Sequence, residues 1–131
     1  MSLFATNTTH GVKITVKSVY QPELSHQNGG KYVFAYQVTI ENQNEYAVQL
    51  LRRHWFIYDS LGEKREVEGF GVIGKQPVIQ PGGAHQYVSG SAFDSDMGAM
   101  HGTYLMVRVV DDQQFRVVIP EFHLIAPERL N

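Results

Sequence analysis

A glycine-rich stretch is the first feature of the sequence that could bind a ligand. Residues 69–74 read Gly-Phe-Gly-Val-Ile-Gly, a G-x-G-x-x-G pattern. In a dinucleotide-binding unit this pattern closes a tight turn and lets a pyrophosphate rest on the N-terminus of the helix that follows. Here Pro77 disfavours helical geometry at the residue before it, so we expect no helix after Gly74. Gly69, Gly71 and Gly74 are therefore expected to shape a loop, with at least one of them at positive φ.

The apolar residues of the same stretch indicate a second role. Phe70, Val72 and Ile73 are more apolar than a purely solvated turn requires, and exposed apolar groups that form a patch mark contact sites. The sequence therefore predicts a loop that binds a protein partner beside a strand edge. Two alternatives stay open, in which the apolar side chains cap the core or the loop binds an anion such as pyrophosphate. The residues of the predicted binding loop are Gly69, Phe70, Gly71, Val72 and Gly74.

Three consecutive polar residues, Arg52, Arg53 and His54, interrupt an otherwise apolar stretch. In a strand the two arginines must point to opposite faces, so one of them is expected to face solvent. The other is expected to pair with Glu41, Glu66 or Glu68, because buried charges are paired. The alternative is that all three polar residues belong to a recognition surface.

The histidines raise the question of a metal site. There are six, and none forms an H-x-H or H-x-x-x-H pair. A specific transition-metal site needs several convergent ligands held by further hydrogen bonds, so such a site is only an alternative here. It would have to gather residues from distant strands at one end of the fold. The residues concerned are His85, His101, Asp94 and Asp96.

Catalytic chemistry has little support in the sequence. There is no Cys, so thiolate nucleophiles and Cys-based zinc sites are excluded. No Gly-x-Ser-x-Gly segment is present either, and Ser89-Gly90-Ser91 reads better as the end of a strand. We therefore expect neither an enzyme nor a bound cofactor.

The elements that must position these residues are strands. Apolar and polar residues alternate with a period of two, and turn signals such as Pro81-Gly82-Gly83 separate the alternating segments. About seven antiparallel strands and no helix are expected, which is typical of a β-sandwich of the immunoglobulin-like or fibronectin type III-like kind. In that architecture Trp55 is expected in the core and Tyr104 at a tyrosine corner. The expected strands are residues 12–17, 31–42, 48–59, 64–68, 84–93, 103–110 and 115–119.

The strand at residues 48–59 carries the arginines, so its faces matter most. Simple alternation places Leu51, Trp55 and Ile57 on one side. The other side then receives Leu50, Phe56 and Tyr58.

Length and composition fit one all-β domain. The 131 residues make a single domain over positions 1–131, of which residues 1–10 are expected to form a flexible tail. A net charge of −2 argues against nucleic acid as a partner, because phosphate recognition needs clustered Lys and Arg. No stretch approaches the ~20 apolar residues of a membrane span, so we expect no membrane insertion. The absence of Cys fits a reducing compartment, so we expect a cytoplasmic protein.

Several segments together resemble the bacterial ApaG family. They are residues 32–36 (YVFAY), 39–42 (TIEN), 48–55 (VQLLRRHW), 69–82 (GFGVIGKQPVIQPG), 87–90 (YVSG), 100–104 (MHGTY) and 115–124 (FRVVIPEFHL). The resemblance covers nearly the whole chain from Gly11 onward. This sequence departs from the family where members often have a Cys and a Thr-Pro pair, since Ser91 and Ser95-Asp96 stand there.

The resemblance implies a fibronectin type III-like sandwich and a genetic association with cobalt and magnesium tolerance or efflux. The resemblance also implies a role in protein interactions. In eukaryotes the same domain is attached to an F-box protein and to a polymerase-delta-interacting protein, where it resembles an interaction module. We therefore expect a non-catalytic domain that binds an unidentified protein partner, with a homodimer through a sheet edge as a further option. The alternatives are direct binding of divalent cations and binding of an anion or pyrophosphate through residues 69–74.

Overall fold

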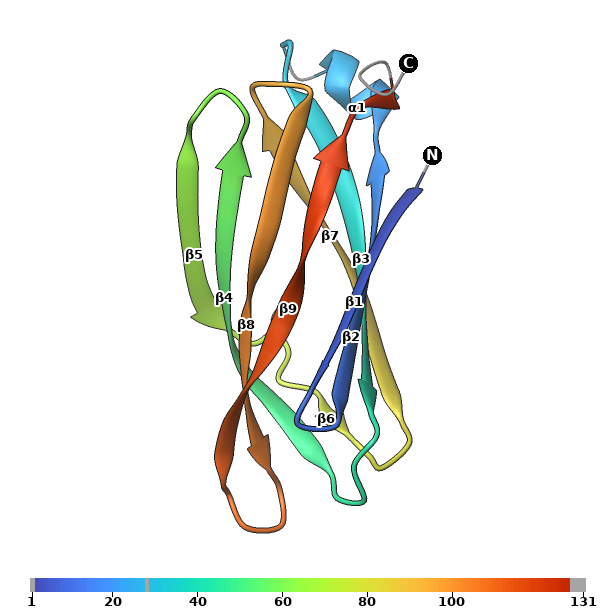
Figure 1. Ribbon diagram of the computed structural model, residues 1–131, viewed down its shortest axis with the longest axis vertical. Coiled ribbons are helices and arrows are strands. Elements are labelled where there is room, and N and C mark those ends of the chain that lie inside the picture. Colours follow the sequence, from blue (N-terminus) through green and yellow to red (C-terminus); the bar gives the residue numbers. More distant parts are fainter. Residues whose placement is uncertain (1, 28, 128–131) are drawn as a thin grey trace.

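The computed structural model describes residues 2–27 and 29–127, and these form a β-sandwich (Figure 1). Within that part of the chain there are nine strands and one short helix. In chain order they are β1 (Ser2–Thr9), β2 (Val12–Tyr20), α1 (Pro22–Gln27), β3 (Tyr32–Asn42), β4 (Val48–Asp59), β5 (Lys64–Phe70), β6 (Val78–Ile79), β7 (Ala84–Phe93), β8 (Met97–Arg108) and β9 (Gln114–Ile125).

The strands form two antiparallel sheets that face each other. One sheet has the order β1-β2-β3-β7, and the other has the order β5-β4-β8-β9, with β6 paired to the start of β4. Every pairing between the named strands is antiparallel. The expected all-β sandwich is therefore confirmed.

Alternation explains how the sheets bury a common core. In β2, Val12, Ile14 and Val16 are fully buried while the residues between them are half-buried, as a period of two dictates. The core has an aromatic centre around Trp55, which is 3% exposed. Its ring centroid lies 5.6 Å from that of Tyr36 and 5.9 Å from that of Phe122, distances at which aromatic rings pack favourably. The expectation of a buried Trp55 is confirmed.

Two elements near the N-terminus differ from the sequence prediction. Residues 1–10 were expected to be a flexible tail, but Ser2–Thr9 form β1, which pairs with β2 along its whole length. No helix was expected, yet Pro22–Gln27 form α1. Its Ser25 hydroxyl donates to the Gln21 carbonyl at 2.7 Å and accepts from the Val33 amide at 2.9 Å, which ties the helix to β3.

The faces of β4 also differ from simple alternation. Leu50 pairs with Met106 and Arg52 with Leu105, so β4 advances two residues while β8 advances one. Leu51 is the extra residue of this β-bulge, and a bulge shifts all following side chains to the other face. Leu50, not Leu51, is therefore buried with Trp55.

Tyr104 is fully buried in β8, but it does not form a tyrosine corner. A tyrosine corner donates its hydroxyl to nearby backbone. Here the Tyr104 hydroxyl instead forms a short hydrogen bond with the Tyr87 hydroxyl, which reaches across from the other sheet. The polar end of this tyrosine therefore lies between the sheets.

The two lateral sides of the sandwich are different. On one side β1 packs against β9, and the Val118 amide donates to the Thr9 hydroxyl at 3.2 Å. We call this the closed side. On the opposite side the edge strands are β5 and β7, and we call this the open side. No helix among the described residues is long and apolar enough to cross a membrane.

We predict that Trp55→Ala lowers the free energy of unfolding by about 3–5 kcal/mol, because it leaves a large cavity between the sheets. Urea denaturation followed by circular dichroism measures this change. Val110→Ala serves as the control, since Val110 is 73% exposed and its truncation should change stability by less than about 0.5 kcal/mol. Similar small effects for both variants would contradict the assigned core.

Candidate functional site

A pocket of about 670 Å³ opens between the two sheets on the open side. Its floor is apolar and includes Trp55, Ile57 and Met100, while strands β5 and β7 form its two walls. Arg53 and Arg65 are the charged residues among those that line it. We call this cavity the inter-sheet pocket, and a pocket of this size with a few convergent polar groups is the default place to look for binding.

The bulge in β4 directs Arg53 into the inter-sheet pocket. After Leu51 the inward positions of β4 are Arg53, Trp55 and Ile57, whereas Arg52 is exposed on the outer face. The prediction that the two arginines lie on opposite faces is therefore confirmed. The predicted pairing of one of them with Glu41, Glu66 or Glu68 is wrong.

Arg53 binds backbone instead of a carboxylate. Its Nη1 donates to the carbonyls of Phe70 and Gly71, each at 3.0 Å. Gly69, the cross-strand neighbour of Arg53 on β5, leaves the space that this guanidinium occupies. A Cβ at Gly69 would lie 2.7 Å from Arg53 Nη2, closer than real contacts allow. The first glycine of the G-x-G-x-x-G pattern therefore leaves room for the guanidinium, and a side chain there would force this flexible group to move.

The other two glycines of the pattern shape a tight turn. The Val72 amide donates to the Lys75 carbonyl at 2.8 Å, and the Lys75 amide donates back at 3.0 Å. Between them Ile73 (φ 48°) and Gly74 (φ 71°) both have positive φ, as a type I′ turn requires. Gly71 also has positive φ (63°), and a Cβ there would lie 2.1 Å from the Lys75 carbonyl oxygen. The expectation of at least one positive-φ glycine is confirmed.

The loop amides are largely used within the fold. The Gly71 amide donates to the carbonyl of Leu51, the extra residue of the bulge, at 2.9 Å. The Val72 amide donates to the Lys75 carbonyl, and the Lys75 amide donates to the Val72 carbonyl. No helix starts after Gly74, where the chain continues to the strand β6. Three of the loop amides are therefore already bonded within the fold, and the loop lacks the helix dipole that a pyrophosphate cradle uses.

The apolar loop residues divide between core and surface. Val72 is 1% exposed and caps the core, as one alternative predicted. Phe70 is 62% exposed and Ile73 is 61% exposed, and both stand at the rim of the inter-sheet pocket. The loop thus presents two apolar side chains to the outside at the mouth of a polar cavity.

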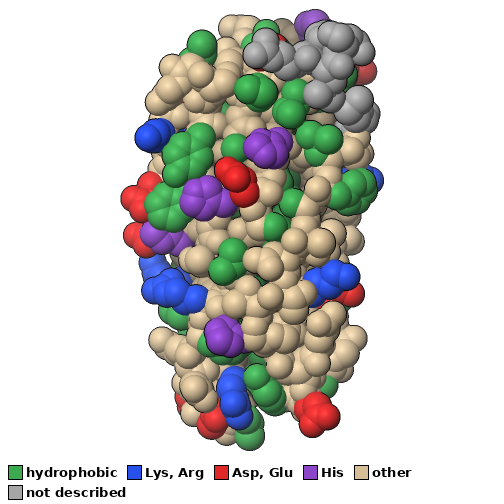
Figure 2. Space-filling model, viewed as in Figure 1, with side chains coloured by type: hydrophobic (Ala, Val, Ile, Leu, Met, Phe, Trp, Pro, Cys, Tyr) green, Lys and Arg blue, Asp and Glu red, His purple; other side chains and the backbone are tan. Residues whose placement is uncertain are grey.

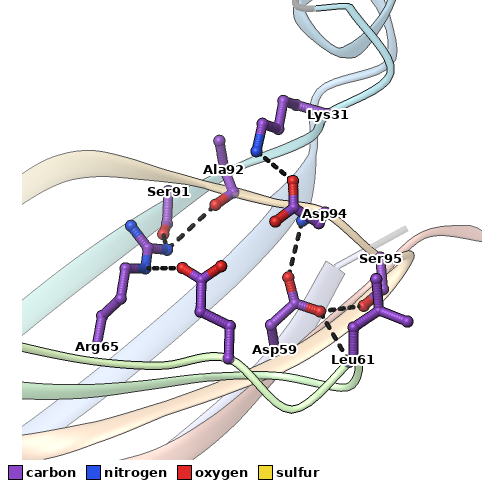
Figure 3. A network of polar contacts seen from close by, with 9 residues as sticks. Lys31, Asp59, Leu61, Arg65, Ser91, Ala92, Asp94 and Ser95 are labelled. Atoms are coloured by element: carbon purple, nitrogen blue, oxygen red, sulfur yellow. Dashed lines mark hydrogen bonds and ion pairs between the residues drawn. The ribbon is translucent and has the colours of Figure 1, made fainter.

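Arg65 crosses the far end of the pocket and joins the two walls (Figure 3). From β5 its Nη2 donates to the Ala92 carbonyl at 3.1 Å and to the Ser91 hydroxyl at 3.3 Å, both on β7. Its Nε lies 3.6 Å from a carboxylate oxygen of Glu63. Arg65 therefore links β5 to β7 at this point.

A second set of contacts beside Arg65 anchors the end of β7. Asp59 accepts hydrogen bonds from the Asp94 amide at 2.8 Å and from the Ser95 hydroxyl at 2.6 Å, and Asp94 in turn pairs with Lys31 (Figure 3). Burial raises the pKa of the Asp59 carboxyl, but these bonds and one from the Leu61 amide outweigh it and hold the pKa below the ordinary 3.8. The Asp59 carboxylate thus organises the turn between β7 and β8.

Three tyrosine hydroxyls meet near Arg53 between the sheets. Burial raises the pKa of Tyr36, Tyr87 and Tyr104, and the nearby positive charge of Arg53 offsets only part of that rise for each. All three phenols therefore stay protonated at neutral pH and can donate hydrogen bonds. Ser89 on β7 adds a further hydroxyl to the lining of the same pocket.

His54 lies on the opposite face of β4 from the pocket. Its Nε2 is 2.7 Å from a carboxylate oxygen of Glu66, and its Nδ1 is 3.2 Å from one of Glu68. The two carboxylates that were expected to pair with an arginine therefore contact this histidine instead. Its ring packs on Phe56 at 4.6 Å, and Phe56 stacks on His101 at 5.1 Å. Figure 2 shows histidine, hydrophobic and acidic side chains close together on this face. Arg52, Arg53 and His54 line one small hollow of about 60 Å³ together with Glu68 and Arg116, although the Arg53 guanidinium donates to the loop carbonyls. A recognition role for these three residues stays a prediction.

The four residues of the metal alternative do not converge. His101 stacks between Phe56 and Tyr58 on the outer face of β8, whereas His85 belongs to β7 in the other sheet. Asp94 is paired with Lys31, and Asp96 lies in the turn after it. Nowhere in residues 2–27 and 29–127 do three His, Cys, Asp or Glu side chains group as metal ligands would.

The sequence alone did not indicate four residues of the site, which are Arg65, Tyr36, Tyr87 and Ser89. A signal for two of them was present, because a period of two places Tyr87, Ser89 and Ser91 on one face of β7. That this face meets Arg53 follows only from the way the sheets stack. No local pattern contains that information.

Comparison with known proteins places the chain among close relatives. Residues 22–108 match the family described as the ApaG domain. The chain is 45% identical over 125 residues to the protein ApaG of Dechloromonas aromatica, covering 94% of this chain and 98% of the relative. It is 43% identical over 122 residues to the protein ApaG of Nitrosomonas europaea, covering 93% and 95%. The crystal structure of an ApaA protein from Bordetella pertussis superposes with a TM-score of 0.84 at 39% identity, covering 88% of this chain and 94% of that one.

We predict that Ile73→Asn raises the free energy of unfolding by about 1 kcal/mol. Positive φ costs a β-branched residue about that much, and the change gives the Asn-Gly pair that type I′ turns favour. Urea denaturation measures the gain. Gly71→Ala is the opposite control, because both its φ and the Lys75 carbonyl resist a side chain, so it should lose stability. A loss for both variants would refute the assigned turn.

We predict that Asp59 makes stability depend on acid pH. Its pKa is lower in the folded chain than in the unfolded chain, so its stabilising effect is complete above the ordinary value of 3.8 and is lost as the pH falls through the folded pKa. Urea midpoints measured from pH 6 down to about pH 2 should therefore fall less steeply for Asp59→Asn than for the wild type. Ser95→Ala, which removes one hydrogen bond to the carboxylate, should give an intermediate slope. Equal slopes for all three proteins would contradict the role of this carboxylate.

Proposed function

The chain belongs to the ApaG domain family, and we propose that it acts as a non-catalytic domain that binds an extended segment of a partner protein along the open side. The segment lies beside β7, and its side chains enter the inter-sheet pocket between β5 and β7. This mode of recognition adds a strand to an exposed sheet edge and takes specificity from adjacent pockets.

The observation that carries this proposal is Ile73. It is β-branched, has φ 48° and is 61% exposed, so the folded domain loses energy at this position and gains little packing in return. Together with Phe70 it presents apolar surface at the mouth of the pocket. An apolar group held there at a cost in stability is explained by a contact with another molecule.

The edge of β7 is suited to receive a strand. Its residues 89–92 are Ser-Gly-Ser-Ala, whose small side chains let a second backbone come close. The Ala92 carbonyl accepts a hydrogen bond from Arg65 of the opposite sheet, which indicates that backbone groups of β7 are accessible from the open side. Strand β5 carries Lys64, Arg65, Glu66 and Glu68, and such charges discourage pairing along an edge. The partner segment is therefore assigned to β7.

The association with cobalt and magnesium that the family resemblance implies fits a role through a partner. Direct coordination would need convergent ligands, and His85, His101, Asp94 and Asp96 lie on separate elements. A binding domain that acts on another protein accounts for such an association without a metal site of its own.

The test selects peptides from a random library on the immobilised domain and maps the bound ones by chemical-shift changes of backbone amides. We expect changes along residues 84–93 and around residues 70–74. Ile73→Asn and Phe70→Ser should each weaken binding by about tenfold, since each removes an exposed apolar contact. Ile73→Asn is expected to be more stable than the wild type, so its loss of binding cannot come from unfolding.

Leu61→Ser is the matched control, because Leu61 is 73% exposed in the turn before β5 and does not line the pocket. It should bind like the wild type. Peptides that map to the outer face of β4 and β8, or that bind Ile73→Asn unchanged, would refute the proposed surface. Self-association in sedimentation that Ile73→Asn abolishes would identify the occupant as a second copy of the chain.

A further inference from the structure

The charged residues that line the inter-sheet pocket are all positive. The lining contains Arg53 and Arg65 and no Asp or Glu. The carboxylates of Glu66 and Glu68 lie on the other face of β5, where they contact His54. Whatever enters this pocket therefore meets positive charge that no lining carboxylate neutralises.

The two arginines differ in how many of their N–H donors are already bonded within the fold. Arg65 donates to the Ser91 hydroxyl and the Ala92 carbonyl and lies near Glu63, so its polar groups are largely occupied. Arg53 uses Nη1 for the two loop carbonyls. Across the part of the chain that the structure describes, no hydrogen bond is formed by Arg53 Nε or Nη2. Those two nitrogens are the donors available to a ligand.

The tyrosine hydroxyls add directed donors beside Arg53. Tyr104 is fully buried, and a buried O–H without an acceptor is costly, so Tyr104 donates to the Tyr87 oxygen. The Tyr87 proton is then left to point into the pocket. Tyr36 and Ser89 line the same pocket, so the Tyr36 hydroxyl is a second phenol donor on this wall. The lining of the pocket therefore contains two phenol hydroxyls and one guanidinium edge, but no carboxylate.

We propose that Arg53, Tyr36 and Tyr87 form an anion site that holds one carboxylate or phosphate group inside the inter-sheet pocket. A guanidinium edge and two O–H donors match the geometry of such a group, and charge-assisted hydrogen bonds of this kind are about twice as strong as neutral ones. The apolar floor of Trp55 and Met100 strengthens them further by lowering the local dielectric constant. This inference rests on the proposed function for the source of the anion, an acidic residue of the partner segment.

The experiment titrates the labelled full chain and follows the Arg53 Nε–H signal and the amides of residues 87–90. The probes are inorganic phosphate and two capped tripeptides, Val-Asp-Val and Val-Asn-Val, at constant ionic strength. We expect both phosphate and Val-Asp-Val to shift these signals in a saturable way. Val-Asn-Val should bind at least about tenfold more weakly, because it lacks the charge.

The variants separate the anion site from general effects. Arg53→Gln should abolish the phosphate response, and Tyr36→Phe should weaken it several-fold without disturbing the loop that Arg53 holds. Arg52→Gln is the matched control, since it removes the same charge from the neighbouring, outward position and should leave binding unchanged. Tryptophan fluorescence of each variant checks that the core around Trp55 is intact.

Each outcome decides one question. Phosphate binding that survives both Arg53→Gln and Tyr36→Phe, or equal binding of the two tripeptides, overturns the anion site while strand addition at β7 stands. Phosphate binding at Arg53 without binding of any library peptide supports the anion site and overturns the partner segment. Tighter binding of phosphate than of Val-Asp-Val identifies a free phosphate as the source, and the reverse identifies a carboxylate.

Discussion

One extra residue in β4 determines which side chains meet between the two sheets. Because side chains alternate along a strand, the insertion of Leu51 reverses the faces of everything after it and turns Arg53 inward. The Leu51 carbonyl that the bulge frees accepts from the Gly71 amide and from the Gln76 side chain at 3.1 Å. Bulge and glycine loop therefore stabilise each other, and the inward arginine ties them together through the loop carbonyls.

The sandwich combines an apolar half with a polar half. Near the closed side the sheets bury aliphatic residues such as Val12 and Ile14 completely, while near the open side a guanidinium and several hydroxyls replace them. Each polar group taken from water costs free energy unless it is bonded, and a domain has only about 5–15 kcal/mol of net stability. The apolar half must therefore supply the stability that the polar half lacks.

Alternation in the sequence was sufficient to predict the sandwich, most strands and the buried Trp55. It failed in β4, because a bulge leaves no mark in composition and only the pairing with β8 reveals it. It failed for β1, since an edge strand that is largely exposed, such as Ser2–Thr9, needs no apolar face. The helix Pro22–Gln27 is only six residues long, too short for a helical period to be visible.

The candidate site was predictable only in part. The glycine pattern pointed to the correct loop, but the sequence could not show that its glycines accommodate Arg53 and the Lys75 carbonyl. Local charge suggested carboxylate partners for an arginine, and those carboxylates belong to His54 instead. Which groups share a pocket depends on the stacking of two sheets, and that is a property of residues far apart in the chain.

The difference between the two lateral sides has a mechanical consequence. The sheets are held together where β1 packs on β9, so a relative rotation of the sheets about that side moves β5 and β7 farthest. Arg65 spans the gap at the greatest distance from this axis, where a small rotation produces the largest separation. Breaking its bond to the Ala92 carbonyl would remove one link across the open side, while the Tyr87–Tyr104 hydroxyl pair and the bonds from Asp94 and Ser95 to Asp59 continue to limit how far β5 and β7 can separate.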